Sequence, residues 1–235
     1  FIILSEKLYS SSSYFNDKIR DLNRSQKKYL KILKNKISEK NIINYFEIIK
    51  NTNVLLIGES IIDQYVYSNV LGKAGKDPIL TINPFKHEEY LGGILSIANI
   101  LSNFCKKITV VTYLGEEKDM PKFINSKLNK NIVLKYVKKK NSPTIRKTRY
   151  VDKEGKSKII GIYEINDQYI SESEENRLEK ILKMQLKKHD NVIVADYGHG
   201  LLTNKLINFI TKNSKKLSIN TQLNSSNFGY HTISK

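Results

Sequence analysis

Short runs of consecutive apolar residues alternate with amphipathic segments from residue 53 to residue 220. Runs such as 54–57 and 191–195 have the length and continuity of strands that are buried on both faces of a parallel sheet. The segments between them place apolar residues at helical spacing. Strands that alternate with helices predict an α/β fold with a mostly parallel sheet flanked by helices. The predicted strands are 54–57, 107–113, 132–137, 191–195 and 216–220, and the predicted helices are 94–104, 172–188 and 203–214.

Two segments between these elements have a different pattern. Residues 78–84 and 143–165 alternate apolar and polar positions, which is typical of antiparallel strands. The second segment is predicted to form a hairpin with its turn at 152–156, where Gly155 can adopt a positive φ. Small β elements inserted into an α/β sheet are candidates for a lid or an oligomer interface, so we expect lid elements near 76–86 and 143–165.

The first 52 residues differ from the rest of the chain. Segment 24–52 carries apolar residues at helical spacing with lysines on the other face, and it is predicted to be an amphipathic helical linker. A membrane-surface helix is the alternative for this segment. In segment 1–23 a serine cluster precedes Tyr14, where it can cap a helix. Because the chain begins at Phe1 rather than Met, we expect a piece of a longer protein in which 1–23 is the remnant of a preceding domain.

Composition adds limits on compartment and partners. The 235 residues include one cysteine, Cys105, and no apolar stretch long enough to span a membrane, so a reducing, cytoplasmic setting is expected. The net charge is +17, but only five of the 40 basic residues are arginines. Nucleic-acid readers use Arg for its bidentate fork, so we interpret the lysine excess, including 138–140, mainly as a solvated surface. A Lys-rich protein that binds nucleic acid or a membrane surface is the alternative.

Candidate functional residues stand at the ends of predicted strands. Asp63 lies in GESIID, just after the first strand, where ligands of open α/β sheets bind. Gly92 and Gly93 open a helix, and backbone amides at such a position can approach a ligand. Asp196 and His199 follow a later strand, and His199 is a candidate base or phosphate partner. The alternatives are a surface or capping role for Asp63 and a tight turn capped by Asp196.

The predicted hairpin carries three cations, Arg146, Lys147 and Arg149, which we count among the candidate substrate-binding residues. In a strand, residues 147 and 149 share one face and residue 146 points to the other. The first pair can therefore meet a substrate phosphate together, or simply face water. The three histidines other than His199 show no metal-ligand spacing with Cys105 or with each other, so no metal site is predicted.

Five segments, taken together, resemble a known family. These are VLLIGESIIDQYVY, LGGILSIANIL, ITVVTYLGE, PTIRKTRYV and VIVADYGHGLL. In order and spacing they are similar to the N-terminal half of the ribokinase-like (PfkB) sugar kinases, and most similar to the D-glycero-D-manno-heptose-7-phosphate kinase group. The resemblance covers about residues 53–223. It implies ATP-dependent phosphoryl transfer, with Mg²⁺, to a hydroxyl of a sugar or sugar phosphate.

The resemblance also implies roles for individual residues. Asp63 would bind sugar hydroxyls, and Gly92 and Gly93 would line the sugar pocket. Ser96 stands where the family has an asparagine, and Glu164 would be the acid of the lid. Asp196 and His199 fall in the family's Asp-Tyr-x-x-Gly segment, with His199 where a lysine is common.

Two further implications concern the ends of the chain. The family's catalytic aspartate lies in a Gly-Ala-Gly-Asp motif, which we expect beyond Lys235, so no catalytic residue is assigned and the isolated chain is expected to be inactive. The C-terminal part of the fold would also be missing.

The N-terminal segment SEKLYSSSSYFND resembles the end of a cytidylyltransferase-like domain. This resemblance suggests a bifunctional kinase and nucleotidyltransferase in nucleotide-sugar or lipopolysaccharide precursor synthesis. Ser96, Asn220 and Gln222 depart from the family pattern, so a decayed kinase domain beside an active nucleotidyltransferase is the alternative.

Overall fold

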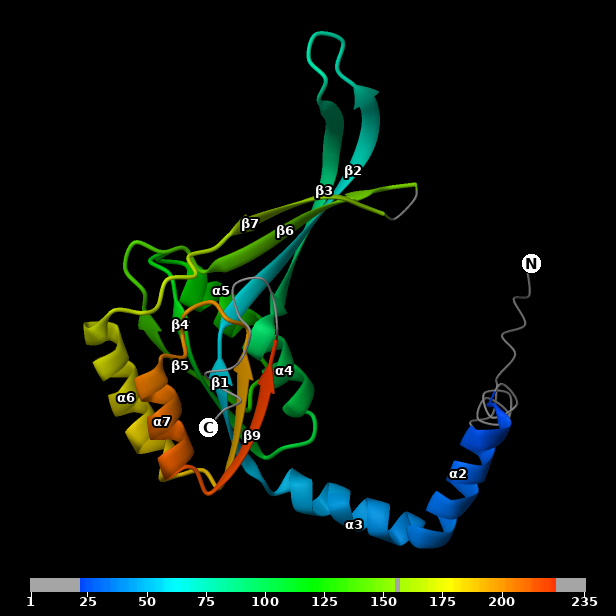
Figure 1. The fold of residues 1–235 in the computed structure, drawn as a ribbon, viewed down its shortest axis with the longest axis vertical. Coiled ribbons are helices and arrows are strands. Elements are labelled where there is room, and N and C mark those ends of the chain that lie inside the picture. Colours follow the sequence, from blue (N-terminus) through cyan, green and yellow to red (C-terminus); the bar gives the residue numbers. More distant parts are fainter. Residues whose placement is uncertain (1–21, 155–156, 223–235) are drawn as a thin grey trace, which may run out of the picture. The chain divides into compact units, whose positions relative to one another are not determined.

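The computed structural model describes residues 22–154 and 157–222, and the chain divides into two units, 1–48 and 49–235. The first unit contains helix α2 (Arg24–Lys36) and most of helix α3 (Glu39–Lys50), shown in blue in Figure 1. Asn23 starts α2 with a capping box, because its side chain accepts from the Gln26 amide while the Gln26 side chain accepts from the Asn23 amide. No residue of either helix is buried. The helix expected near Tyr14 lies outside the described residues.

The second unit is built on a sheet of five parallel strands in the order β5-β4-β1-β8-β9. The strands are β1 (Asn53–Gly58), β4 (Lys107–Leu114), β5 (Ile132–Lys138), β8 (Asn191–Asp196) and β9 (Lys216–Thr221). Each one overlaps a strand that the apolar runs predict. The parallel α/β fold expected from the sequence is therefore confirmed.

Helices cover both faces of this sheet (Figure 1). Its inner strands β1, β4 and β8 are accordingly mostly apolar and buried, whereas the edge strand β9 is mostly exposed. On β1, Val54 and Leu56 pack into a core with α4 and α5, whereas Leu55 and Ile57 pack into a second core with α6 and α7. The helices are α4 (Gly93–Leu101), α5 (Met120–Lys127), α6 (Glu172–Leu186) and α7 (Asn204–Asn213). Helix α5 was not predicted, because its eight residues give too short a periodic pattern.

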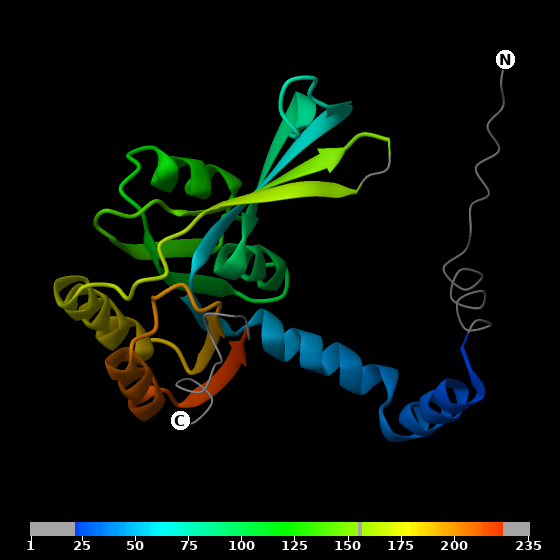
Figure 2. The same cartoon turned by 45° about the horizontal axis from the view of Figure 1, so that its top comes forward.

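A second sheet of four strands, in the order β3-β2-β6-β7, extends from the carboxyl end of β1 (Figure 2). Its strands are β2 (Ser60–Lys73), β3 (Leu80–Gly92), β6 (Ile145–Asp152) and β7 (Lys158–Glu164). The β2–β3 and β6–β7 pairs are antiparallel, and β2 and β6 pair in parallel. This sheet contains both segments expected to form a lid and is called the lid below, but its extent corrects the prediction. The long strand β2 was not expected, and the predicted segment 78–84 is only the start of β3.

The lid hairpin reverses between β6 and β7, as the sequence predicts. The Asp152 amide donates to the Ser157 carbonyl at 2.9 Å and closes the turn. Gly155, to which the positive φ was assigned, lies outside the described residues. Within the described part of the chain, no helix has both the length and the apolar character needed to cross a membrane.

Candidate functional site

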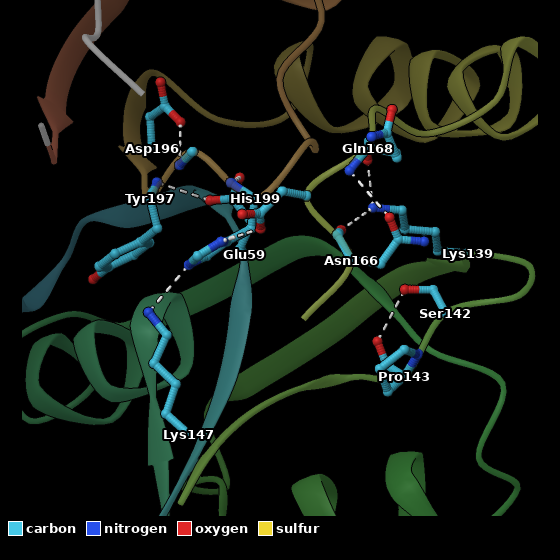
Figure 3. Close-up of polar contacts among 12 residues, drawn as sticks. Glu59, Lys139, Ser142, Pro143, Lys147, Asn166, Gln168, Asp196, Tyr197 and His199 are labelled. Atoms are coloured by element: carbon cyan, nitrogen blue, oxygen red, sulfur yellow. Dashed lines mark hydrogen bonds and ion pairs between the residues drawn. The ribbon is translucent and has the colours of Figure 1, made fainter. Parts of the chain in front are cut away.

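The site lies where the carboxyl ends of β1 and β8 meet the lid. Because β1 and β8 are parallel neighbours, Glu59, which follows β1, and Asp196, which ends β8, lie at the same edge of the sheet. The loop after β8 carries Tyr197 and His199, and lid strand β6 brings Lys147 to the same place (Figure 3). Three segments distant in sequence therefore contribute to one polar cluster.

Glu59 holds the loop after β8 in place. Its carboxyl group is fully buried and accepts from the backbone amides of Tyr197 at 3.0 Å and His199 at 3.2 Å. Burial raises the pKa of Glu59 to about 7, since a charged carboxylate is poorly solvated there, and the nearby Asp196 acts in the same direction. Glu59 was not among the predicted site residues. Its position directly after a buried strand was the signal that it faces the site.

His199 links the lid to a loop of the main domain. Its Nδ1 lies 2.7 Å from a carboxylate oxygen of Asp167, and its Nε2 lies 3.1 Å from Nζ of Lys147. Burial lowers the pKa of both His199 and Lys147. A neutral imidazole fits both contacts, because Nδ1–H can donate to Asp167 while Nε2 accepts from Lys147. The arrangement fixes the Lys147 side chain at the junction of lid and sheet.

Lys139 corrects the prediction that residues 138–140 are simply a solvated run. Lys138 and Lys140 are exposed, but Lys139 is buried. Its ammonium group donates to the carbonyls of Asn166 at 2.6 Å and Gln168 at 2.5 Å (Figure 3). Burial lowers the pKa of Lys139. Lys139 thus anchors the loop that carries Asp167, and through Asp167 it supports His199.

Asp63 lies on β2 beside the glycine pair. One carboxylate oxygen forms an ion pair with Arg149 at 2.5 Å, and the other would lie 2.2 Å from a Cβ added to Gly92. Gly93 has a φ of +55°, which favours glycine, and a Cβ there would come within 2.5 Å of the Glu59 carbonyl oxygen. Of the candidate residues, the structure therefore brings Asp63, Gly92, Gly93, Lys147 and Arg149 together.

Other predicted residues lie apart from this group. Arg146 contacts Glu89 and lies 4.0 Å from Glu164, on the face of the lid opposite the Lys147 side chain. Ser96 lines a separate hollow of about 460 Å³ with Tyr90, Leu91 and other residues. Asp196 accepts from the Gly198 amide at 2.9 Å, which is the turn-capping contact weighed as its alternative role.

Two residues of the cluster, Asp167 and Lys139, had no signal in the sequence. Asp167 belongs to the loop between β7 and α6, and only the folded chain brings it to His199. Lys139 is one lysine among 40 basic residues, and nothing local distinguishes it from its neighbours. Among the residues that the structure describes, no three His, Cys, Asp or Glu side chains gather into a group that could hold a metal ion.

This chain has a ribokinase-like fold, in which a parallel α/β sheet is joined to a second, smaller β sheet. It is similar to ribokinase from Giardia lamblia, with 14% identity and a TM-score of 0.55 over 79% of this chain and 55% of that chain. It is also similar to phosphofructokinase-2 from Escherichia coli, solved in complex with fructose-6-phosphate. The identity is 14% and the TM-score is 0.52 over 75% of this chain and 56% of that chain.

The sequence is similar to bifunctional proteins named HldE. The protein of Aliarcobacter butzleri is 27% identical over 180 residues, which are 72% of this chain and 36% of that protein. The protein of Desulfatibacillum aliphaticivorans is 27% identical over 161 residues, 68% of this chain and 32% of that protein. No family model matches the chain. The chain thus spans about a third of these curated relatives and about half of the solved kinases.

Proposed function

We propose that this chain is the sugar-binding and lid-bearing part of an ATP-dependent kinase that phosphorylates a sugar phosphate, with heptose 7-phosphate as the first candidate. The similarity to ribokinase-like kinases and to HldE supports the kinase class. One observation carries the proposal further. A carboxylate, a glycine pair and two lid cations converge at the carboxyl edge of the sheet, where ligands of open α/β folds bind.

Each part of this cluster has a role in the proposal. Asp63 accepts hydrogen bonds from sugar hydroxyls, and Gly92 leaves room for the sugar because it carries no side chain beside Asp63. Lys147 and Arg149 bind the anionic group of the substrate. His199 and Glu59 act as positioning residues, since they hold Lys147 and the loop after β8. Catalysis in this class is mainly positioning and electrostatic stabilisation.

ATP and Mg²⁺ are the cofactors of the proposal. They are supported by the kinase neighbours alone, because the described residues offer no group of three metal-ligating carboxylates or imidazoles. We therefore assign no residue of this chain to the metal or to the nucleotide, and no step is derived through them.

Two measurements test the function. Calorimetric titration of the 235-residue chain with D-glycero-D-manno-heptose 7-phosphate should give saturable binding that Asp63→Asn weakens at least tenfold. Asp190→Asn is the matched control, because this exposed aspartate precedes β8 at the opposite edge of the sheet. The longest natural protein that contains this chain should then transfer phosphate from ATP to the same sugar. Absence of transfer to every sugar and sugar phosphate tested would contradict the proposal.

A homodimer formed through the lid belongs to the same proposal. The lid exposes large apolar side chains on three strands, including Leu71, Phe85, Ile160 and Ile162. Pairing of two lids would remove this surface from water. Sedimentation of the chain should show a dimer that Ile160→Lys with Ile162→Lys converts to a monomer, and a wild-type monomer would refute this part.

A further inference from the structure

The Asp63–Arg149 ion pair occupies the carboxylate that the proposed function assigns to the sugar. The guanidinium of Arg149 lies 2.5 Å from Oδ1 of Asp63, and its central carbon lies 5.7 Å and 6.0 Å from the ring centres of Tyr65 and Tyr163. The second oxygen of Asp63 lies beside Gly92, which carries no side chain to cover it. A sugar that uses both carboxylate oxygens, one for each of two hydroxyls, must take Oδ1 from Arg149, and the Asp63–Arg149 pair is called the latch below.

The cations around the Asp63–Arg149 pair favour the binding of a second negative charge beside the Asp63 carboxylate. Lys147 is the register partner of Asp63 across the parallel β2–β6 pairing, and its Nζ lies 5.7 Å from the centre of the Tyr163 ring that also faces Arg149. Two cations therefore flank one carboxylate. The side chains of Arg149 and Asp63 are only 19% and 27% exposed, so solvent screens these charges less than on an open surface.

These contacts have different consequences for neutral and phosphorylated ligands. A neutral sugar that takes Asp63 from Arg149 leaves a partly buried guanidinium without its partner, which is unfavourable. A sugar phosphate supplies hydroxyls for Asp63 and an anion of about −1.5 to −2 charges for the released Arg149 and for Lys147. Resting on the proposed function, we infer that the Asp63–Arg149 pair is a specificity device that admits phosphorylated sugars and rejects their neutral counterparts.

The test compares matched ligands on the 235-residue chain. Calorimetry is run with D-glycero-D-manno-heptose and its 7-phosphate, and with fructose and fructose 6-phosphate. The wild type should bind the phosphorylated member of at least one pair with about 100-fold higher affinity than the neutral member. Arg149→Met should weaken phosphate-ester binding at least tenfold while neutral-sugar binding is unchanged or stronger. Arg149→Lys, which keeps the charge but not the planar fork, should fall between the two.

Lys153→Met is the matched control, because it removes one lid cation at an exposed position outside this cluster. Its ligand preference should equal that of the wild type. If Arg149→Met lowers the affinity for the neutral sugar and for its phosphate ester equally, the role of Arg149 is merely structural and the inference is overturned. A wild-type chain that binds none of the four ligands would overturn the inference as well.

The outcomes separate this inference from the proposed function. A natural protein containing the chain that phosphorylates only neutral sugars would retain the kinase function and refute the latch. Selective, Arg149-dependent binding without any phosphoryl transfer would retain the latch and refute the kinase function.

Discussion

At the residue scale, Glu59 is the most constrained group of the site. Its carboxyl is fully buried and receives two backbone amides, yet burial outweighs these bonds and raises its pKa to about 7. The folded protein therefore keeps this proton up to about pH 7, whereas the unfolded chain releases it near 4.5. Between these pH values the folded state binds more protons than the unfolded state, so the contribution of Glu59 to the free energy of unfolding falls as pH rises.

We predict that replacing Glu59 by Gln removes this pH dependence. As pH rises from about 4.5 to about 7, the free energy of unfolding of the wild type should fall relative to that of Glu59→Gln by roughly 1–3 kcal/mol. Urea unfolding at pH 4.5, 6 and 8 measures this difference. Glu154→Gln, at an exposed position, reports the pH dependence caused by losing a surface carboxyl. If the difference in free energy of unfolding between the wild type and Glu59→Gln is constant with pH, the raised pKa assigned to Glu59 is contradicted.

The candidate residues that the structure places side by side are those on or beside strands. Asp63, Lys147 and Arg149 occupy alternating positions of β2 and β6, so period-two geometry places them on one face. Arg146 was assigned to the site although the same geometry turns it away, toward Glu89. Asp167 and Lys139 could not be predicted, because loop packing rather than local pattern brings them to His199.

At the element scale, the turn from the lid into α4 is a tight junction that only glycine fits. Gly93 begins α4 with a φ of +55°, and the Ile94 amide donates to the Glu59 carbonyl at 3.0 Å. A Cβ on Gly93 would lie 2.5 Å from that same carbonyl oxygen. Gly72, on β2, has a φ of +96° but open space around it. Substitution of Gly72 therefore tests backbone strain alone, whereas substitution of Gly93 tests backbone strain together with a steric clash.

We predict that Gly93→Ala is much more destabilising than Gly72→Ala. Both substitutions place alanine at a positive φ, which costs about 1–2 kcal/mol. Gly93→Ala must also displace the Glu59 backbone, so its total loss should reach about 3 kcal/mol or more. Free energies of unfolding from urea titration give the comparison. Equal losses at the two positions would mean that the carbonyl can move aside freely.

Elements were predicted well where the apolar pattern is unambiguous. Strands β1, β4 and β8 are largely buried and form continuous apolar runs, whereas β5 and β9 are mostly half-exposed to exposed. Strand β2 was missed because its far half, apart from buried Ser68, is half-exposed to exposed and mixes polar with apolar residues, so no single period dominates. Its role as the central strand of the lid depends on pairing with β3 and β6, which are non-local.

At the scale of the whole molecule, the two units differ in how they use apolar residues. The unit of residues 49–235 holds two buried cores, one on each face of its parallel sheet. In contrast, α2 and α3 contain no buried residue, and several large side chains there, such as Tyr29, Ile43 and Ile48, are more than half exposed. Burial of apolar surface is the main source of folding free energy, so these helices contribute little to it.

We predict that a chain starting at Ile49 keeps the stability of the α/β unit. Deletion of residues 1–48 should leave a single cooperative transition in urea, with the free energy of unfolding changed by less than about 0.5 kcal/mol. Ile57→Ala, in the core of the sheet, shows that the assay detects a real loss, since truncation of a fully buried isoleucine costs about 2–5 kcal/mol. The shortened chain should also self-associate less, because the exposed apolar residues of α2 and α3 are removed. Loss of the cooperative transition would show instead that these helices are required for the fold.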